Sequence, residues 1–215
     1  AMVATELALA VAYPYAGNIG GGGFMVYRKK DGEIGALDYR EKAPLAASKD
    51  MYLDANENII KGKSTVGSMA VGIPGTVAGV FEAHRKFGSM PMEEILQPVI
   101  DLAKRGVIVT LKQEKRIESY QKGFLEANKD SILFTKNWKE NDTIKYNALA
   151  ATLTRIQKNG REEFYKGETA QKLASFVQAN GGIMTLEDLA KYEAKWRTPI
   201  TFAYDDLKVI SMSPP

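Results

Sequence analysis

The chain of 215 residues contains no cysteine and a single histidine, His84. The lack of cysteine excludes disulfides, a thiolate nucleophile and cysteine metal sites. A Ser-His-Asp triad or a histidine metal site would have to use His84, which lies at the polar end of a predicted helix. We interpret His84 as a solvated helix residue, and we expect neither a metal site nor a cofactor.

Long apolar runs and a strong charge of either sign are also missing. The longest apolar run, residues 7–13, is far shorter than the ~18 residues that a membrane span needs. The net charge is only +3, and no basic block is interleaved with aromatic residues. We therefore expect no membrane span and no nucleic-acid partner. Hydrophobic residues make up 45% of the chain, which is enough to bury a core.

Both ends of the chain look cut. The first helix opens without a capping residue or a positively charged leader, and the last residues follow directly on a predicted strand. We expect residues 1–215 to form one incomplete region, truncated at both ends, of a larger protein.

Periodicity and helix-stop signals predict helices in the middle of the chain and strands near its ends. Helices are expected at residues 1–13, 74–87, 91–104, 111–128, 147–158, 169–179 and 185–192, with a short helical turn at 48–53 inside the loop 42–72. Strands are expected at residues 24–28, 34–39, 200–204 and 207–212. Asn147 is a candidate helix cap, and Thr185 with Asp188 resembles a capping box. This order indicates an α+β or layered α/β fold whose two ends join one sheet.

Four consecutive glycines, residues 20–23, invite comparison with phosphate-binding loops. The dinucleotide pattern fails because Met25 takes the place of the last glycine, and because a helix precedes the loop and a strand follows it. We interpret the run as a tight helix-to-strand turn packed against another backbone.

Paired carboxylates could indicate a glycosidase. The pairs are Glu93-Glu94, Glu162-Glu163 and Asp205-Asp206. All three fall in predicted helix starts or turns, where acidic residues are favoured for structural reasons. We interpret them as structural.

Arg40 stands at the end of a predicted strand, where its side chain would reach any cleft onto which the sheet opens. A planar guanidinium can hold a carboxylate through two parallel hydrogen bonds. The spacing alone favours a different role, a surface ion pair with Glu41 or Asp38.

Several blocks together resemble the large subunit of gamma-glutamyltranspeptidases, and they follow the family's order over nearly the whole chain. The blocks are Gly17-Asn18-Ile19-Gly20-Gly21-Gly22-Gly23-Phe24-Met25, Asp38-Tyr39-Arg40-Glu41-Lys42-Ala43-Pro44, Asp50-Met51-Tyr52-Leu53-Asp54, Gly72-Ile73-Pro74-Gly75-Thr76-Val77-Ala78-Gly79, Glu163-Phe164-Tyr165-Lys166-Gly167 and residues 180–189. The final Ser213-Pro214-Pro215 is similar to the start of the family's Pro-Pro-Ser-Ser-Gly-Gly stretch. Each block is weak alone, but the combination is specific.

The resemblance implies an N-terminal-nucleophile hydrolase fold, an αββα sandwich, of which this chain is the helix-rich large-subunit portion. It implies a precursor that cuts itself into two subunits, so the partner of this chain would be the small subunit of the same precursor. A threonine at the start of that small subunit would attack the gamma-glutamyl amide of a substrate such as glutathione. Water, an amino acid or a peptide would then take the gamma-glutamyl group. A periplasmic or extracellular location is also implied.

Only one position of the family's catalytic cleft falls within this chain. The resemblance implies that Arg40 binds the alpha-carboxylate of the substrate. The nucleophile would lie outside the chain, so neither Thr65 nor Thr76 is expected to act as one, and the isolated fragment is expected to be inactive.

Alternatives for the function stay open. A poly-gamma-glutamate depolymerase or a cephalosporin-acylase-like member of the same superfamily would also offer an arginine to a carboxylate. A non-catalytic binding module is the alternative from another class.

Overall fold

The computed structural model describes residues 1–16, 18–128 and 130–214. Gly17, which opens the glycine-rich motif, and Pro215, which ends the last one, lie outside the described residues. The helices are α1 (Met2–Ala12), α2 (Thr76–Phe87), α3 (Met92–Arg105), α4 (Leu111–Asn128), α5 (Asn147–Asn159), α6 (Arg161–Tyr165), α7 (Glu168–Ala179) and α8 (Leu186–Ala190), with short 3-10 segments η1 (Ser68–Ala70) and η2 (Leu133–Thr135). The strands are β1 (Phe24–Arg28), β2 (Ile34–Asp38), β3 (Val107–Ile108), β4 (Thr143–Ile144), β5 (Lys195–Arg197), β6 (Ile200–Tyr204) and β7 (Leu207–Ser211).

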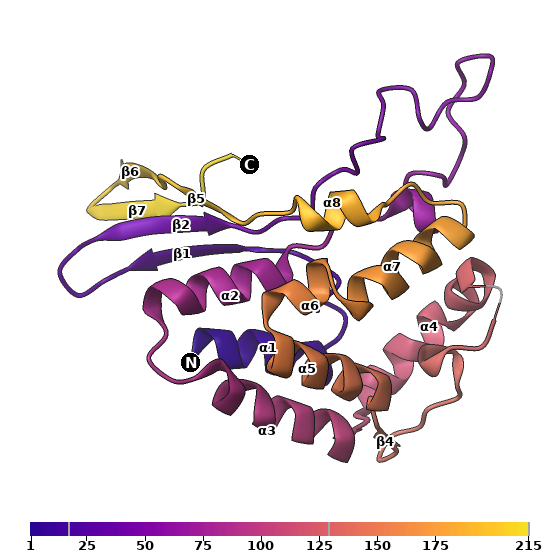
Figure 1. The fold of residues 1–215 in the computed structure, drawn as a ribbon, viewed down its shortest axis with the longest axis horizontal. Coiled ribbons are helices and arrows are strands. Elements are labelled where there is room, and N and C mark those ends of the chain that lie inside the picture. The colour runs from indigo at the N-terminus through magenta and orange to yellow at the C-terminus, as the bar shows by residue number, and fades with distance from the viewer. Residues whose placement is uncertain (17, 129, 215) are drawn as a thin grey trace.

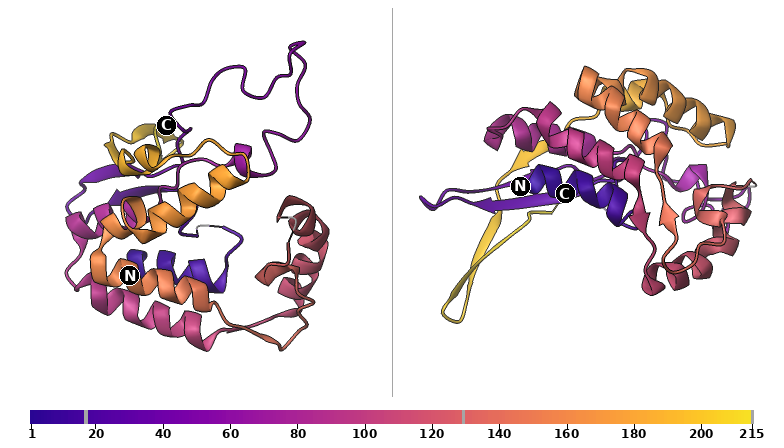
Figure 2. Two further views of the ribbon diagram at one scale, coloured as in Figure 1. Left: turned by 45° about the vertical axis from the view of Figure 1, so that its right-hand side comes forward. Right: turned by 90° about the horizontal axis from the view of Figure 1, so that it is seen from below.

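The helices lie on one side of a three-stranded sheet with the order β1-β2-β5 (Figure 1). Both strand pairs are antiparallel, and β5 brings the C-terminal part of the chain against the N-terminal hairpin. The hairpin β6–β7 pairs within itself and projects away from the helices (Figure 2). The fold is therefore α+β, as predicted. The two ends of the chain do meet in one sheet, but through β5, which was not predicted, whereas the predicted C-terminal strands β6 and β7 form a separate sheet.

On the face of this sheet that carries Phe24 and Val26, these two residues of β1 are 43% and 40% exposed, whereas the β2 residues paired with them are buried. The opposite face buries Leu37, which packs with Ala83 of α2 and with Trp196. Among the described residues, helices cover one face only, so this chain forms one helical layer and one sheet layer of the expected αββα sandwich.

The long helices agree closely with the sequence. Glycines follow the ends of α2, α3, α5 and α7, and apolar residues recur with a helical period in α3. In α3 the buried residues Leu96, Val99, Ile100 and Ala103 form one stripe, and Gly106 ends the helix with φ 91°. The predicted capping box is present at the start of α8, where the Thr185 side chain accepts from the Asp188 backbone N–H.

Several short elements differ from the prediction. Residues 48–53 form turns and not a helix. The short elements η1, η2, α6, β3, β4 and β5 were not predicted, because such short segments carry too little periodicity. Asn147 is the first residue of α5 and does not cap it; Tyr146 takes the cap position.

The glycine-rich run packs against backbone, as interpreted from the sequence. A Cβ on Gly22 would lie 2.6 Å from the Tyr39 carbonyl oxygen and 2.7 Å from the Glu41 nitrogen. A Cβ on Gly75 would lie 1.9 Å from the same carbonyl oxygen, and one on Gly79 would lie 2.2 Å from Cγ of the Tyr39 ring. Tyr39 thus fits between glycines of two separate segments.

The acidic pairs are structural. Glu93 and Glu94 lie in the first turn of α3, and Asp205 lies in the β6–β7 turn. Glu163 is buried and joins α5, α6 and α7, because one of its oxygens lies 2.9 Å from Nε of Arg155 and accepts from the Thr169 backbone N–H and hydroxyl.

The contact between α2 and Tyr39 predicts opposite outcomes for two helical glycines. Gly79→Ala places a methyl group inside the Tyr39 ring and is expected to destabilise the fold by about 1–3 kcal/mol. Gly123→Ala in α4, where a Cβ meets nothing within 4 Å, is expected to stabilise it by about 0.5–1 kcal/mol. Urea denaturation measures the free energy of unfolding of both variants and of the parent. If both substitutions changed this free energy by the same amount and in the same direction, the packing of Gly79 against Tyr39 would be contradicted.

Candidate functional site

Arg40 lies two residues beyond the end of β2, and its backbone is held on both sides by side chains. Its N–H donates to Oδ1 of Asp38 at 3.0 Å, and its carbonyl oxygen accepts from the Tyr192 hydroxyl at 2.8 Å. The residue itself is exposed. A fixed main chain therefore presents a solvent-facing guanidinium.

The ion pair that the spacing favoured does not form. The second oxygen of Asp38 is taken by Arg197, whose Nε and terminal nitrogen lie 2.8 Å and 2.7 Å away. Glu41 instead lies against the glycine run, since a Cβ on Gly22 would lie 2.8 Å from one of its carboxylate oxygens. Among the described residues, the Arg40 guanidinium makes no ion pair, so it is available to a ligand.

Charged side chains of both signs lie near Arg40 in the chain and in the sheet. Lys42 donates from Nζ to the Glu193 carbonyl oxygen at 2.9 Å and lies 4.7 Å from the centre of the Tyr192 ring. Burial lowers the pKa of Lys42, and neighbouring Lys195 lowers it further. The acidic side chains of Asp38 and Glu193 act to raise the same pKa, so cationic and acidic groups are mixed in this part of the molecule.

The phenols behind Arg40 stay protonated. Burial raises the pKa of Tyr39 to about 12, and burial likewise raises the pKa of Tyr192, with a further rise from the neighbouring Tyr165. Tyr192 is therefore a hydrogen-bond donor over the whole physiological range, and its hydroxyl proton serves the Arg40 carbonyl oxygen.

The segment after Arg40 is tied to α8. Oδ1 of Asp188 accepts from the Leu45 backbone N–H at 2.6 Å, and Oδ2 accepts from the N–H and hydroxyl of Thr185 at 2.7 Å each. Burial acts to raise the pKa of Asp188, but these hydrogen bonds outweigh it and the pKa is lowered. The charged carboxylate thus holds two chain segments together.

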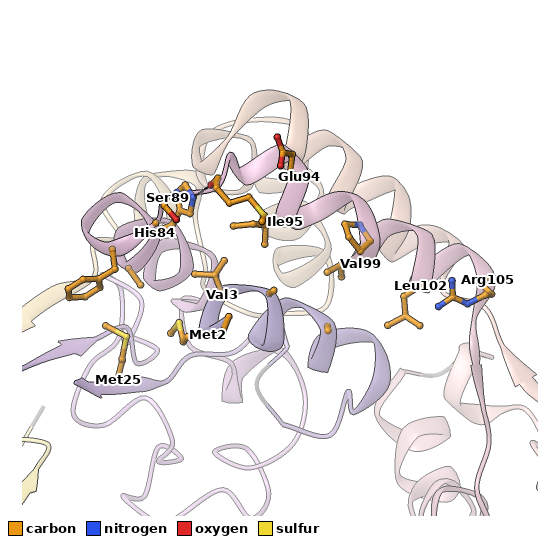
Figure 3. A pocket seen from close by; sticks show the side chains of 18 residues that line it. Met2, Val3, Met25, His84, Ser89, Glu94, Ile95, Val99, Leu102 and Arg105 are labelled. Atoms are coloured by element: carbon orange, nitrogen blue, oxygen red, sulfur yellow. Dashed lines mark hydrogen bonds between the residues drawn. The ribbon is translucent and has the colours of Figure 1, made fainter. Parts of the chain in front are cut away.

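His84 lies elsewhere, in an apolar groove of about 610 Å³ between α1, α2 and α3 (Figure 3). Ser89 and Glu94 line the same groove, which raises the question of a catalytic triad. The Nε2 atom of His84 donates to the Met90 carbonyl oxygen at 2.7 Å, and no hydrogen bond joins His84 to Ser89 or Glu94 in the part of the chain that the structure describes. The groove therefore lacks the geometry of a triad.

The whole chain, residues 1–215, matches the family model described as gamma-glutamyltranspeptidase. It is 44% identical over 219 aligned residues to a protein of Escherichia coli named glutathione hydrolase proenzyme. This chain belongs to the gamma-glutamyltranspeptidase family.

Solved structures of gamma-glutamyltranspeptidases share the fold. The match to the enzyme from Helicobacter pylori has a TM-score of 0.96 and 41% identity, and it covers 100% of this chain and 62% of that one. The match to the Bacillus anthracis transpeptidase enzyme CapD has a TM-score of 0.80 and 29% identity, with 100% and 66% covered. These neighbours confirm that the chain has part of an N-terminal-nucleophile hydrolase fold.

The chain spans 38% of the length of the Escherichia coli relative, so it represents a part of what that family member contains. No cluster of three or more potential metal ligands occurs among the described residues. Within the same residues, no helix combines the length and the apolar character needed to cross a bilayer.

The sequence of this member of the gamma-glutamyltranspeptidase family did not reveal which side chains hold Arg40 and Asp38 in place. Arg40 and its neighbours could be found from the family motif, but Tyr192 and Arg197 lie 152 and 159 residues away from their partners Arg40 and Asp38. The antiparallel pairing of β5 with β2 brings them together, and no local signal marks the three residues of β5 as a strand.

The lowered pKa of Asp188 predicts a loss of stability in acid. A carboxyl group with a pKa below its unfolded value stabilises the fold above about pH 4 and loses this contribution as pH falls through the lower folded value. Asp188→Asn is expected to cost about 1–3 kcal/mol at pH 7, and the gap to the parent should narrow below about pH 4.

Urea denaturation at pH 7 and at pH 3 measures this gap. Glu187→Gln removes an exposed carboxylate from the same helix and is expected to change stability by less than about 0.5 kcal/mol. A gap for Asp188→Asn that is the same at both pH values would contradict the role of its charge.

Proposed function

We propose that this chain is an incomplete large-subunit region of a proenzyme that cleaves gamma-glutamyl amide bonds, as in glutathione, and transfers the gamma-glutamyl group to water, amino acids or peptides. The observation that carries the proposal is the match of the entire chain to a relative named glutathione hydrolase proenzyme, at 44% identity. The same match supports it over the two alternatives in the superfamily, a poly-gamma-glutamate depolymerase and a cephalosporin acylase.

In this proposal Arg40 binds the substrate. Its guanidinium would hold the alpha-carboxylate of the gamma-glutamyl group through paired charged hydrogen bonds, with the amide to be cleaved at the other end of the glutamyl side chain. The exposed side chain, the fixed backbone and the absence of an ion-pair partner among the described residues support this role.

The chemistry would be completed by the small subunit of the same precursor. Its amino-terminal threonine would attack the amide carbon through its hydroxyl group, while its own amine takes the hydroxyl proton. The amide C–N bond would then break, and the leaving amine would take that proton. The resulting gamma-glutamyl ester would pass its acyl group to water or to an acceptor amine. Phe24 and Val26 are exposed on the sheet face that the helices of this chain do not cover, and they would offer that subunit an apolar surface.

The location follows from the family in the same way. We infer that the mature protein works in the periplasm or outside the cell.

Substitution of Arg40 tests the substrate role. In the full-length, processed protein, Arg40→Ala is expected to raise KM for gamma-glutamyl-p-nitroanilide, with a loss in kcat/KM equivalent to about 2–5 kcal/mol, because a charged hydrogen-bond partner is removed. Arg28→Ala, which removes an exposed arginine from the end of β1, is the matched control and should leave KM unchanged. An unaltered KM in Arg40→Ala would contradict the proposed role of Arg40 in binding the substrate carboxylate.

An assay of the isolated chain tests whether the nucleophile belongs to the other subunit. We expect residues 1–215 alone to give no turnover of gamma-glutamyl-p-nitroanilide, because the proposed nucleophile belongs to the other subunit. The positive control is the full-length, processed protein at the same concentration. Turnover by the isolated chain, abolished by Thr65→Ala or Thr76→Ala, would show that the nucleophile lies within it.

A further inference from the structure

Residues 192–197, which include β5, hold the backbone of Arg40 through two hydrogen bonds, one direct and one by way of Asp38. The Tyr192 hydroxyl bonds the Arg40 carbonyl oxygen at 2.8 Å, and Arg197 holds the Asp38 carboxylate that accepts from the Arg40 N–H. The peptide groups on either side of the Arg40 Cα are therefore each held by a side chain that depends on this segment.

The position of the Tyr192 hydroxyl is itself closely determined. Its ring stacks on Tyr165 with centroids 5.6 Å apart and planes 9° from parallel. The Tyr192 carbonyl oxygen accepts from the Arg161 guanidinium. A Cβ on Gly75 would lie 2.1 Å from the Tyr192 hydroxyl oxygen, so this atom touches the backbone beside it.

The stack is anchored in turn to the start of α2. The Tyr165 hydroxyl accepts from the Ala78 backbone N–H at 3.1 Å and donates to the Pro74 carbonyl oxygen at 2.9 Å. Tyr192 is only 2% exposed and Tyr165 is fully buried, so both rings are enclosed by protein. The stacked Tyr192 ring thus holds its hydroxyl group at the Arg40 carbonyl oxygen.

We propose that Tyr192 is a positioning residue for the carboxylate-binding guanidinium of Arg40, with Asp38 and Arg197 holding the other side of the same residue. The inference rests on the proposed function of Arg40. Recognition of a carboxylate by two parallel hydrogen bonds requires the guanidinium to be held within about half an ångström of its place, and the backbone is the base from which this long side chain extends.

A structural role and a positioning role make different predictions. If Tyr192 only stabilised the fold, its hydroxyl would affect the denaturation midpoint and leave substrate affinity alone. If it positions Arg40, loss of the hydroxyl affects KM for a substrate with a free alpha-carboxylate, and it does so only while the Arg40 guanidinium is present.

The test is a double-mutant cycle in the full-length, processed protein. Tyr192→Phe keeps the stacked ring and removes one hydrogen bond; we expect KM for gamma-glutamyl-p-nitroanilide to rise about 3- to 10-fold, with kcat changed less than about twofold. In the Arg40→Ala background, the same substitution is expected to leave kcat/KM unchanged within about twofold, because no guanidinium remains to be placed.

Tyr146→Phe is the matched control, since Tyr146 is also a buried phenol and lies at the start of α5, away from Arg40. Its KM should equal that of the parent. Arg197→Lys is the second probe, because it weakens the paired contact with Asp38 and should also raise KM. It keeps the test decisive if Tyr192→Phe fails to fold.

The outcomes separate the two proposals. An unchanged KM in Arg40→Ala overturns the proposed function of Arg40. With a raised KM in Arg40→Ala, an unchanged KM in a folded Tyr192→Phe overturns the positioning role of Tyr192, and an unchanged KM in Arg197→Lys overturns the role of Arg197 and Asp38. A Tyr192→Phe effect that persists at full size without Arg40 also overturns it, because the hydroxyl would then act through another group.

Discussion

The close fit of Tyr39 between glycine backbones is the constraint on which the rest of the structure depends. Side chains on Gly22, Gly75 or Gly79 would overlap the carbonyl group or the ring of Tyr39. Because these glycines come from two segments, the contact draws the turn after α1 and the start of α2 onto the end of β2. The Gly75 and Thr76 N–H groups also donate to the Gly21 carbonyl oxygen, at 2.8 Å and 3.0 Å, which fastens the two segments to each other.

This constraint leads directly to the site, since Arg40 is the next residue. The N–H and carbonyl of Tyr39 pair with Gly23, and those of Lys42 pair with Ile73, so both neighbours of the Arg40–Glu41 dipeptide are part of the hydrogen-bonded framework. Asp38 and Tyr192 then fix Arg40 itself. The chain thus combines a rigid backbone with a side chain that solvent can reach, which suits a binding residue better than a structural one.

The two faces of the sheet differ in what covers them. One face packs on α2 through Leu37, while the other exposes Phe24 and Val26. In an αββα sandwich a second sheet covers such a face, and the chain spans 38% of the length of its Escherichia coli relative. The apolar residues there make physical sense as an interface with the part of the protein that would also supply the nucleophile.

Much of this molecule could be predicted from the sequence, because the information is local. Helix-start and helix-stop residues placed α2, α5 and α7 to within a few residues, and an apolar helical period placed α3. The polar helix α4 was also predicted, and the turn at Asp205 placed the hairpin β6–β7. The glycine run was read correctly as a close approach of two backbones, and the family motif singled out Arg40. What surrounds Arg40 was decided only by tertiary structure: the spacing favoured an ion pair with Asp38, but β5 delivers Arg197 to that carboxylate, and Tyr192 to the Arg40 carbonyl oxygen. These partners are more than 150 residues apart in the chain, and pairing of a three-residue strand depends on the neighbours it meets in the fold and not on any pattern of its own.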